Sequence, residues 1–207
     1  MLLAFDVGNT NIVLGVFKDG QMIANWRMET DNKKSADEYG MIISQLFKYE
    51  GLKMENVKDV IISTVVPSVL YTLQHLSMKY FNRKAMVIGP GIKTGLIVKY
   101  DNPKQVGADR IVNAIGAINL YKVPMVIVDF GTATTFCVIN ENKEYLGGAI
   151  LPGIKISMGA LFEKSFAQTF MMGTAHSCRD RRHRLFATIS QEQNLWLLAN
   201  KIIYTYP

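Results

Sequence analysis

Hydrophobic and polar residues follow the same pattern in two distant segments of the chain. Residues 2–17 and residues 125–139 each contain an apolar run, a short polar turn that opens with Asp-x-Gly, and a second apolar run. Short apolar runs on both sides of a glycine-containing turn are typical of β-hairpins. The repeat therefore predicts two related units, each beginning with a hairpin.

The segments between and around the hairpins predict further strands and helices. We expect a strand over 22–28, a helix capped by Ser35 that runs to about Tyr49, a strand over 57–66, a helix from Pro67 through Leu76, a strand over 85–88 and a helix over 107–120. The first helix should bury one face, made of Tyr39, Ile42, Ile43, Leu46 and Phe47. This order predicts an α/β fold, a mixed sheet covered by helices. Since the pattern restarts at Met125, we place the domains at 1–118 and 119–207.

The two polar turns have the composition of phosphate-binding turns. Gly8 lets the backbone approach an anion, and the turn N–H groups with Asn9, Thr10 and Asn11 can donate to phosphate oxygens. Asp6 can hold a hydrated Mg²⁺ beside them. A single Asp-x-Gly-x-Thr is also an ordinary β-turn. Its duplication favours two turns that face each other across a nucleotide cleft.

Composition limits the classes of protein to consider. The 207 residues are 49% hydrophobic, enough for a sizeable core, and no apolar run is long enough to span a bilayer. We expect no signal peptide, and two distant cysteines are consistent with a reducing, cytoplasmic location. The net charge of +6 is scattered except for residues 179–184, which lack interleaved aromatic residues. Neither membrane nor nucleic acid is therefore expected as a partner.

Five short motifs together carry a family resemblance. They are Asp6-Val-Gly-Asn-Thr-Asn11, Ser63-Thr-Val-Val-Pro67, Gly107-Ala-Asp-Arg-Ile-Val-Asn-Ala114, Asp129-Phe-Gly-Thr-Ala-Thr-Thr135 and Gly147-Gly-Ala-Ile-Leu-Pro-Gly153. In order and spacing, residues 1–164 resemble the type III pantothenate kinases of the actin, sugar-kinase and heat-shock ATPase superfamily. The resemblance implies two related ribonuclease-H-like domains. Compared with the family pattern, the C-terminal domain is expected to be incomplete.

The same resemblance implies an activity. It is the ATP-dependent phosphorylation of pantothenate to 4′-phosphopantothenate, the first step of coenzyme A biosynthesis. The cofactors implied are Mg²⁺ with ATP and a monovalent cation, K⁺ or NH₄⁺. The implied partners are ATP, pantothenate and a second copy of the chain in a homodimer.

Roles are also implied residue by residue. The ATP-binding residues would be Asp6, Val7, Gly8, Asn9, Thr10, Asn11, Ile12, Val13 and Thr132, and the pantothenate-binding residues Tyr100, Gly107, Ala108, Asp109 and Arg110. Asp129 would hold the monovalent cation, and Asp6 the Mg²⁺ that accompanies ATP. Asp109 would be the catalytic base.

Physical chemistry supports these roles but leaves simpler alternatives open. The acceptor hydroxyl needs a carboxylate within hydrogen-bond reach, and Asp109 lies where a helix dipole stabilises an anion. Asp109 could instead be only a helix N-cap. Arg110 could form a surface salt bridge, Asp6 and Asp129 could stabilise their turns, and Tyr100 could be a half-buried packing residue.

The chain departs from the family pattern after about Ser165. The tail is either a truncated or frame-altered product or a remodelled lid over the active site. The first interpretation predicts an alternative function, that of an inactive nucleotide-binding homologue or regulator. His176, Cys178, Asp180 and His183 fit no standard zinc spacing, so we expect no metal site there.

Overall fold

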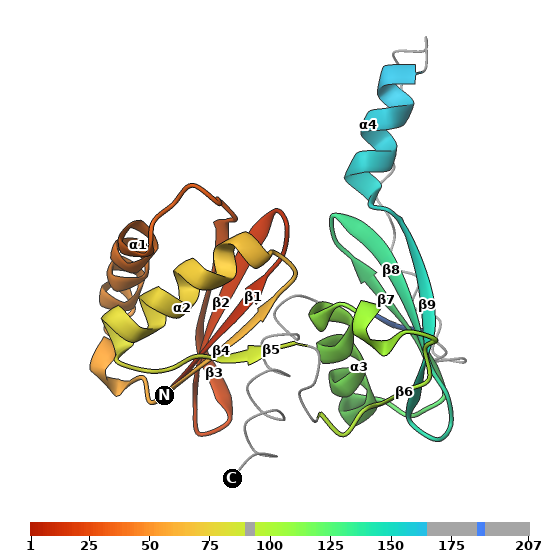
Figure 1. The fold of residues 1–207 in the computed structure, drawn as a ribbon, viewed down its shortest axis with the longest axis horizontal. Coiled ribbons are helices and arrows are strands. Elements are labelled where there is room, and N and C mark those ends of the chain that lie inside the picture. Colours follow the sequence, from red (N-terminus) through yellow and green to blue (C-terminus); the bar gives the residue numbers. More distant parts are fainter. Residues whose placement is uncertain (90–93, 165–185, 189–207) are drawn as a thin grey trace.

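The computed structural model describes residues 1–89, 94–164 and 186–188. These residues form a mixed α/β fold with two lobes, each built on its own five-stranded sheet (Figure 1). Most of the tail after about 165, including His176, Cys178, Asp180 and His183, lies outside the described residues. In the part of the chain described, no helix combines the length and apolar character needed to cross a membrane.

The first sheet has the strand order of a ribonuclease-H-like domain. Its strands are β1 (Leu2–Val7), β2 (Asn11–Lys18), β3 (Gln21–Glu29), β4 (Asp59–Thr64) and β5 (Met86–Ile88), in the order β3-β2-β1-β4-β5. The strands β1, β2 and β3 form an antiparallel meander, while β1, β4 and β5 run parallel. The predicted meander and mixed sheet are confirmed. The fourth strand is shorter than the predicted 57–66, because the Thr64 hydroxyl accepts from the Val66 N–H and turns the chain.

Helices α1 (Ala36–Tyr49) and α2 (Pro67–Phe81) cover one face of this sheet. As predicted, Ser35 caps α1, and its partner in a capping box is Glu38. Helix α2 begins at Pro67 as predicted but continues five residues beyond Leu76. The prediction that Ile42 lies on the buried face of α1 is wrong, since that side chain is exposed.

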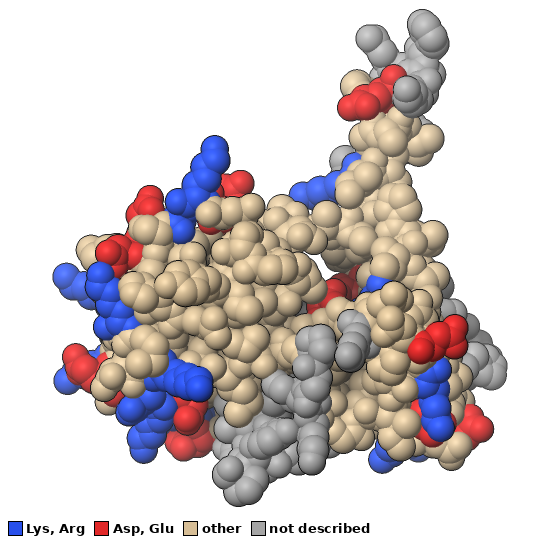
Figure 2. Space-filling view, viewed as in Figure 1, with Lys and Arg blue, Asp and Glu red and all other residues tan. Residues whose placement is uncertain are grey.

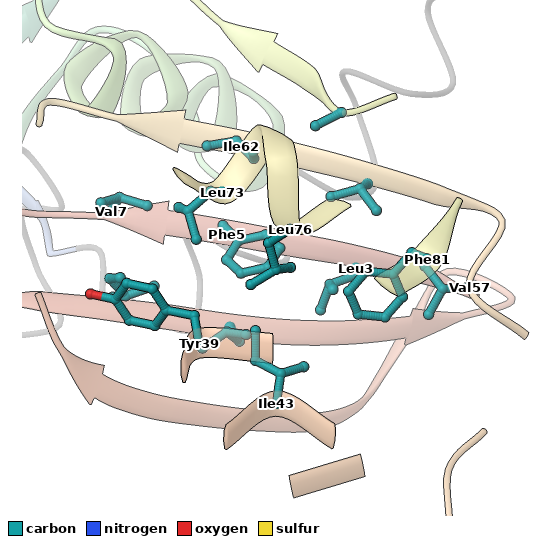
Figure 3. Packing of buried hydrophobic residues seen from close by; sticks show 14 of the residues in the cluster. Leu3, Phe5, Val7, Tyr39, Ile43, Val57, Ile62, Leu73, Leu76 and Phe81 are labelled. Atoms are coloured by element: carbon teal, nitrogen blue, oxygen red, sulfur yellow. The ribbon is translucent and has the colours of Figure 1, made fainter. Parts of the chain in front are cut away.

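The core of the first lobe lies between the sheet and these helices. Figure 3 shows Leu73 and Leu76 of α2 lying over Phe5 of β1, within one cluster of buried side chains. Leu3, Phe5 and Val7 alternate toward this side, so Asp6 belongs to the opposite face. The period of β1 thus fixes the direction in which the acid points.

The second sheet repeats the first in its central strands. Its strands are β6 (Ile97–Val98), β7 (Met125–Phe130), β8 (Ala133–Ile139), β9 (Glu144–Pro152) and β10 (Phe186–Thr188), in the order β10-β7-β8-β9-β6. The meander β7-β8-β9 corresponds to β1-β2-β3, and β10 runs parallel to β7 as β4 does to β1. The predicted restart at Met125 is therefore confirmed as a structural repeat.

Helix α3 (Ala108–Leu120) is packed between the two lobes. Its buried residues Val112, Ala114 and Ala117 belong to one cluster with Ala4 and Ile61 of the first sheet and with Met125 and Ile127 of the second. The single-turn helices η1 (Met54–Asn56) and η2 (Pro103–Gln105) lie in connections. Helix α4 (Ile154–Lys164) projects away from the second sheet (Figure 1).

The contact between α1 and α2 depends on a residue without a side chain. A Cβ at Gly40 would lie 2.5 Å from the ring of Tyr80, whose hydroxyl donates to Asp37 at 2.9 Å. We predict that Gly40→Ala lowers the free energy of unfolding by about 1–3 kcal/mol, because the ring has to move out of a packed position. Urea denaturation followed by circular dichroism measures the change.

The control is Gly159→Ala in α4, where an added Cβ would meet nothing within 4 Å. This variant should be neutral or more stable by up to about 1 kcal/mol, because alanine favours the helix. An unchanged stability of Gly40→Ala would contradict the close packing of α1 on α2.

Candidate functional site

The first polar turn, between β1 and β2, is fastened from two sides. The Gly8 N–H donates to the Asn11 carbonyl at 2.9 Å and closes the turn. The Thr30 hydroxyl donates to the Gly8 carbonyl at 2.7 Å, and the Thr30 N–H donates to the Thr10 carbonyl at 3.0 Å. The side chains of Asn9 and Thr10 remain exposed. The turn is thus held rigidly while its polar groups face outward.

The second polar turn, between β7 and β8, is held by the end of β9. The Gly131 N–H donates to the Ala133 carbonyl at 3.0 Å, and the Gly153 N–H donates to the Thr132 carbonyl at 3.1 Å. Gly153 has no room for a Cβ, which would collide with the carbonyl oxygens of this turn. This close approach explains why a glycine follows Pro152.

The two turns meet at their threonines. The Thr10 and Thr132 hydroxyl oxygens are 2.9 Å apart, although 122 residues separate them in sequence. Both side chains are exposed, and the hydroxyl that accepts in this pair keeps its own proton, which it can donate to an anion that lies over the pair. The predicted facing of the two turns is confirmed at this contact. Figure 2 shows a hollow between the lobes, with acidic side-chain atoms visible inside it.

The beginning of α3 places Asp109 beside this junction of the lobes. The N-cap of α3 is Gly107, so Asp109 is the second helical residue and the N-cap alternative is wrong. Its carboxylate accepts from the Arg110 N–H at 2.8 Å. A Cβ on Gly107 would collide with the carboxylate of Asp109. The glycine therefore makes room for the acid that follows it.

Asp129 is the last residue but one of β7 and lies on the face that is turned toward α3. Met125 and Ile127, four and two residues earlier, pack in the cluster around α3, and the strand period puts Asp129 on the same side. Asn113 Nδ2 donates to Asp129 Oδ2 at 3.0 Å. Burial raises the pKa of the Asp129 carboxyl, the hydrogen bond from Asn113 opposes this, and the nearby Asp109 charge adds to the rise.

Arg110 lies against a buried pair of side chains. Burial opposes its charge, but its hydrogen bond with the Tyr145 hydroxyl and the proximity of Asp109 outweigh this and raise the pKa of the guanidinium. The Tyr145 hydroxyl donates to Cys137 Sγ at 3.5 Å. Tyr145 is fully buried, and burial together with Cys137 raises its pKa to about 12. A phenol that stays neutral thus fixes the position of Arg110, which forms no salt bridge within the described residues.

Tyr100 lies on the backbone of β9. A Cβ on Gly147 would come within 3.0 Å of the Tyr100 ring, so this glycine leaves space for the aromatic side chain. The ring stays partly exposed, at 37%. Its position fits both the predicted pocket role and the alternative of a half-buried packing residue.

The remaining predicted residues differ in what they can offer to a ligand. Val7, Ile12 and Val13 are buried in the core, and Ala108 is buried at the start of α3, so each can reach a ligand only through its backbone. Sequence reasoning missed Thr30 and Tyr145, and it gave no role of their own to Asn113, Gly147 and Gly153, which lie within the family motifs; all five support the predicted residues. The return of β3 toward the first turn was a signal for Thr30, and the four-residue spacing from Asp109 was a signal for Asn113.

In the described ranges, no three His, Cys, Asp or Glu side chains converge on a common metal site. A carboxylate with a neutral amide partner, as at Asp129 and Asn113, could hold a cation only together with further oxygen ligands, such as amides and backbone carbonyls. Those ligands suit hard cations, whereas histidine and thiolate sites suit zinc.

Comparison with known proteins identifies the family. The sequence profile of the type III pantothenate kinase family matches residues 2–170, which include every site residue discussed above. This match covers most of the chain. The chain therefore belongs to the type III pantothenate kinase family.

Solved structures with a similar arrangement are distant in sequence. A proposed Baf family transcriptional activator from Campylobacter jejuni is 19% identical, with a TM-score of 0.46, and the match covers 98% of this chain and 76% of that one. The activator of 2-hydroxyisocaproyl-CoA dehydratase from Clostridium difficile is 14% identical, with a TM-score of 0.43 and coverages of 73% and 45%. The Aquifex aeolicus Ppx/GppA phosphatase is 13% identical, with a TM-score of 0.45 and coverages of 79% and 56%. The chain spans about half the length of the last two proteins.

The raised pKa of Asp129 predicts how the free energy of unfolding depends on pH. In a carboxyl group whose pKa is higher in the folded than in the unfolded protein, the stabilising contribution is present below the unfolded pKa and is lost as pH rises through the folded pKa. We predict that Asp129→Asn, which removes the buried charge, raises the free energy of unfolding at pH 7 in buffer without potassium or magnesium. The gain should vanish below about pH 4, near the ordinary Asp pKa.

Asp37→Asn is the control, for which we expect a change in stability of the opposite sign. The hydrogen bonds from Lys79 and from Tyr80 lower the pKa of this exposed carboxyl. Asp37→Asn should therefore lower stability at pH 7, and its effect should fade as the pH falls. A loss of stability at pH 7 in Asp129→Asn would contradict the burial of its charge.

Proposed function

We propose that this chain phosphorylates pantothenate to 4′-phosphopantothenate with ATP, the first step of coenzyme A biosynthesis. The observation that carries the proposal is the family match over residues 2–170, within which the two Asp-x-Gly turns meet and α3 brings Asp109 beside them. The runner-up, an inactive nucleotide-binding homologue or regulator, shares the turns but predicts no turnover. No contact in the described residues favours it.

The two turns supply the nucleotide site in this proposal. The exposed N–H groups and side chains of the first turn, Asp6–Asn11, and the hydroxyl of Thr132 would hold the phosphates of ATP. The contact of Thr10 with Thr132 supports this, because it brings the hydroxyl groups of both turns to one place. The backbone of Val7, Ile12 and Val13 completes the site. Mg²⁺ bound to ATP would neutralise phosphate charge, and Asp6 would hold the water molecules that surround this ion.

Asp109 acts on the acceptor in this proposal. The hydroxyl oxygen of pantothenate attacks the γ-phosphorus, the bond from this phosphorus to the β,γ-bridging oxygen breaks, ADP leaves, and the hydroxyl proton moves to Asp109. Arg110 binds the carboxylate of pantothenate or the transferred phosphoryl group. Gly107 and Ala108 offer backbone, and Tyr100 lines the pocket with the exposed part of its ring.

Asp129 would hold the monovalent cation, K⁺ or NH₄⁺. The structure supports this role, because Asp129 is a partly buried acid whose one described hydrogen bond is to a neutral amide and whose neighbour Asp109 is a second acid. A cation there supplies a positive charge between the acids and the phosphates.

We also propose that the chain acts as a homodimer. Apolar side chains are exposed along the end of β9 and on α4, namely Ile150, Leu151, Ile154, Ile156, Leu161 and Phe162. Several exposed apolar side chains on neighbouring elements are a feature of protein interfaces. Sedimentation of the purified protein tests this part of the proposal.

The activity is tested by a coupled assay of ADP formation with ATP, Mg²⁺, K⁺ and pantothenate. We expect turnover on the order of one per second, the lower end of ordinary enzymes. Phosphopantothenate is identified in the same reaction by mass spectrometry. Binding of ATP without any formation of phosphopantothenate would support the inactive homologue instead.

Two substitutions at the start of α3 test the role of Asp109. Asp109→Asn keeps the shape but removes the base, so kcat should fall by roughly two to four orders of magnitude while ATP binding is retained. Gly107→Ala keeps the carboxylate but displaces it, and should lower kcat by up to about 100-fold.

Tyr49→Ala, at the exposed end of α1, is the control for both variants and should keep normal kinetics. ATP binding is followed by isothermal titration calorimetry, so that loss of turnover is separated from loss of the nucleotide site. Near-normal turnover of Asp109→Asn would remove Asp109 from the mechanism.

A further inference from the structure

Asn113 is an unusual residue for the place it occupies. It lies in the middle of α3, is 1% exposed, and is surrounded by the small and apolar residues that join the two lobes. Its Nδ2 donates to Asp129 Oδ2 at 3.0 Å. Its other polar atom, Oδ1, is buried and accepts no hydrogen bond from any residue that the structure describes.

A buried acceptor without a donor is unfavourable. Leaving one unsatisfied costs about 1–3 kcal/mol, and an apolar side chain of the same volume would avoid this. The helix around Asn113 is otherwise built for packing, with alanine, valine, isoleucine and glycine. Packing therefore does not account for the amide, and its one observed partner is the carboxylate of Asp129.

The position of Asn113 on α3 indicates how its amide acts on Asp129. Asp109 precedes it by four residues, so both lie on one side of the helix, and both act on Asp129. Asp109 repels the Asp129 carboxylate, while Asn113 attracts it. Without the donor, Asp129 would be free to rotate away from α3 and toward solvent.

We propose that Asn113 is a positioning residue, whose amide holds Asp129 Oδ2 so that the carboxylate stays directed at a monovalent cation beside Asp109. The inference deepens the proposed function and rests on its assignment of the cation to Asp129. Asn113 fits this role because it is a neutral donor: a lysine or arginine at this position would itself neutralise Asp129 and remove its attraction for a cation.

Three variants separate this role from a structural one. Asn113→Leu keeps the branched arrangement of heavy atoms, removes the donor and removes the unsatisfied oxygen. Asn113→Asp keeps the shape and replaces the donor by a charge that repels Asp129. Asn119→Ala is the matched control, since Asn119 lies on the same helix, is exposed, and donates to the Ile115 carbonyl at 2.6 Å.

The first readout is binding, independent of activity. Thermal unfolding is measured while K⁺ replaces N-methylglucamine at constant ionic strength, because a ligand that binds the folded protein raises its melting temperature. We expect a K⁺-dependent rise in the wild type and in Asn119→Ala, and none in Asn113→Leu or Asn113→Asp. Without K⁺, Asn113→Leu should melt at or above the wild-type temperature.

The second readout is kinetic. In Asn113→Leu, the K⁺ concentration that gives half-maximal activity should rise at least tenfold, while the KM for pantothenate changes less than twofold. A wild-type K⁺ response retained in Asn113→Leu would overturn the proposal. Destabilisation of Asn113→Leu without K⁺, together with an unchanged K⁺ response, would also overturn it and assign Asn113 a structural role.

The two proposals fail in different ways. If the wild type forms no phosphopantothenate but its K⁺-dependent stabilisation is lost in both Asn113 variants, the proposed function is wrong and the role of Asn113 is supported. If the wild type phosphorylates pantothenate but shows no K⁺-dependent stabilisation, the cation site and the role of Asn113 are overturned, while the activity stands.

Discussion

The structure depends on one helix that is packed between two sheets. Helix α3 is buried without interruption from Val112 to Ala117, because its two sides face different lobes. Alanine and glycine at these positions let both sheets approach closely, as large side chains would not. The same packing fixes the direction in which the first turn of the helix points. Asp109 therefore takes its position from the core and does not depend on a flexible loop.

Strand period has the same effect on the other two acids. In both β1 and β7, the residues that pack toward α3 alternate with residues that pack away from it, and the acid at the end of the strand follows this alternation. Asp6 and Asp129 are thus directed to the space between the lobes by the hydrophobic residues that precede them. A shift of either strand by one residue would turn its acid away from this space.

The sequence pattern was sufficient to predict an element where the signal for that element is local. The meanders, the capping box of α1 and the start of α2 at Pro67 were all predicted, because each depends on neighbours within a few residues. The exposure of Ile42 was not predicted, since the helical period places it next to the buried residues Tyr39 and Ile43. The supports of the site were missed for a similar reason. Tyr145 and Gly153 act on residues that are distant in the chain, and no spacing in the sequence marks such contacts.

Asp109 and Asp129, the acids at the centre of the molecule, lower the stability of the fold. Asp109 and Asp129 lie close enough for one charge to raise the pKa of the other, and burial adds to the effect. A protein selected only for stability would place apolar residues at such a point. Asn113 also lowers the stability. Its buried amide oxygen accepts no hydrogen bond from any described residue, at a position where an apolar side chain could pack. The buried charge of Asp129 and its repulsion by Asp109 are unfavourable at neutral pH without a compensating positive charge, and the cation proposed above would supply one. This follows if the polar centre of the molecule is built for a cation and for phosphate, and the hydrophobic helix around it supplies the stability that the centre lacks.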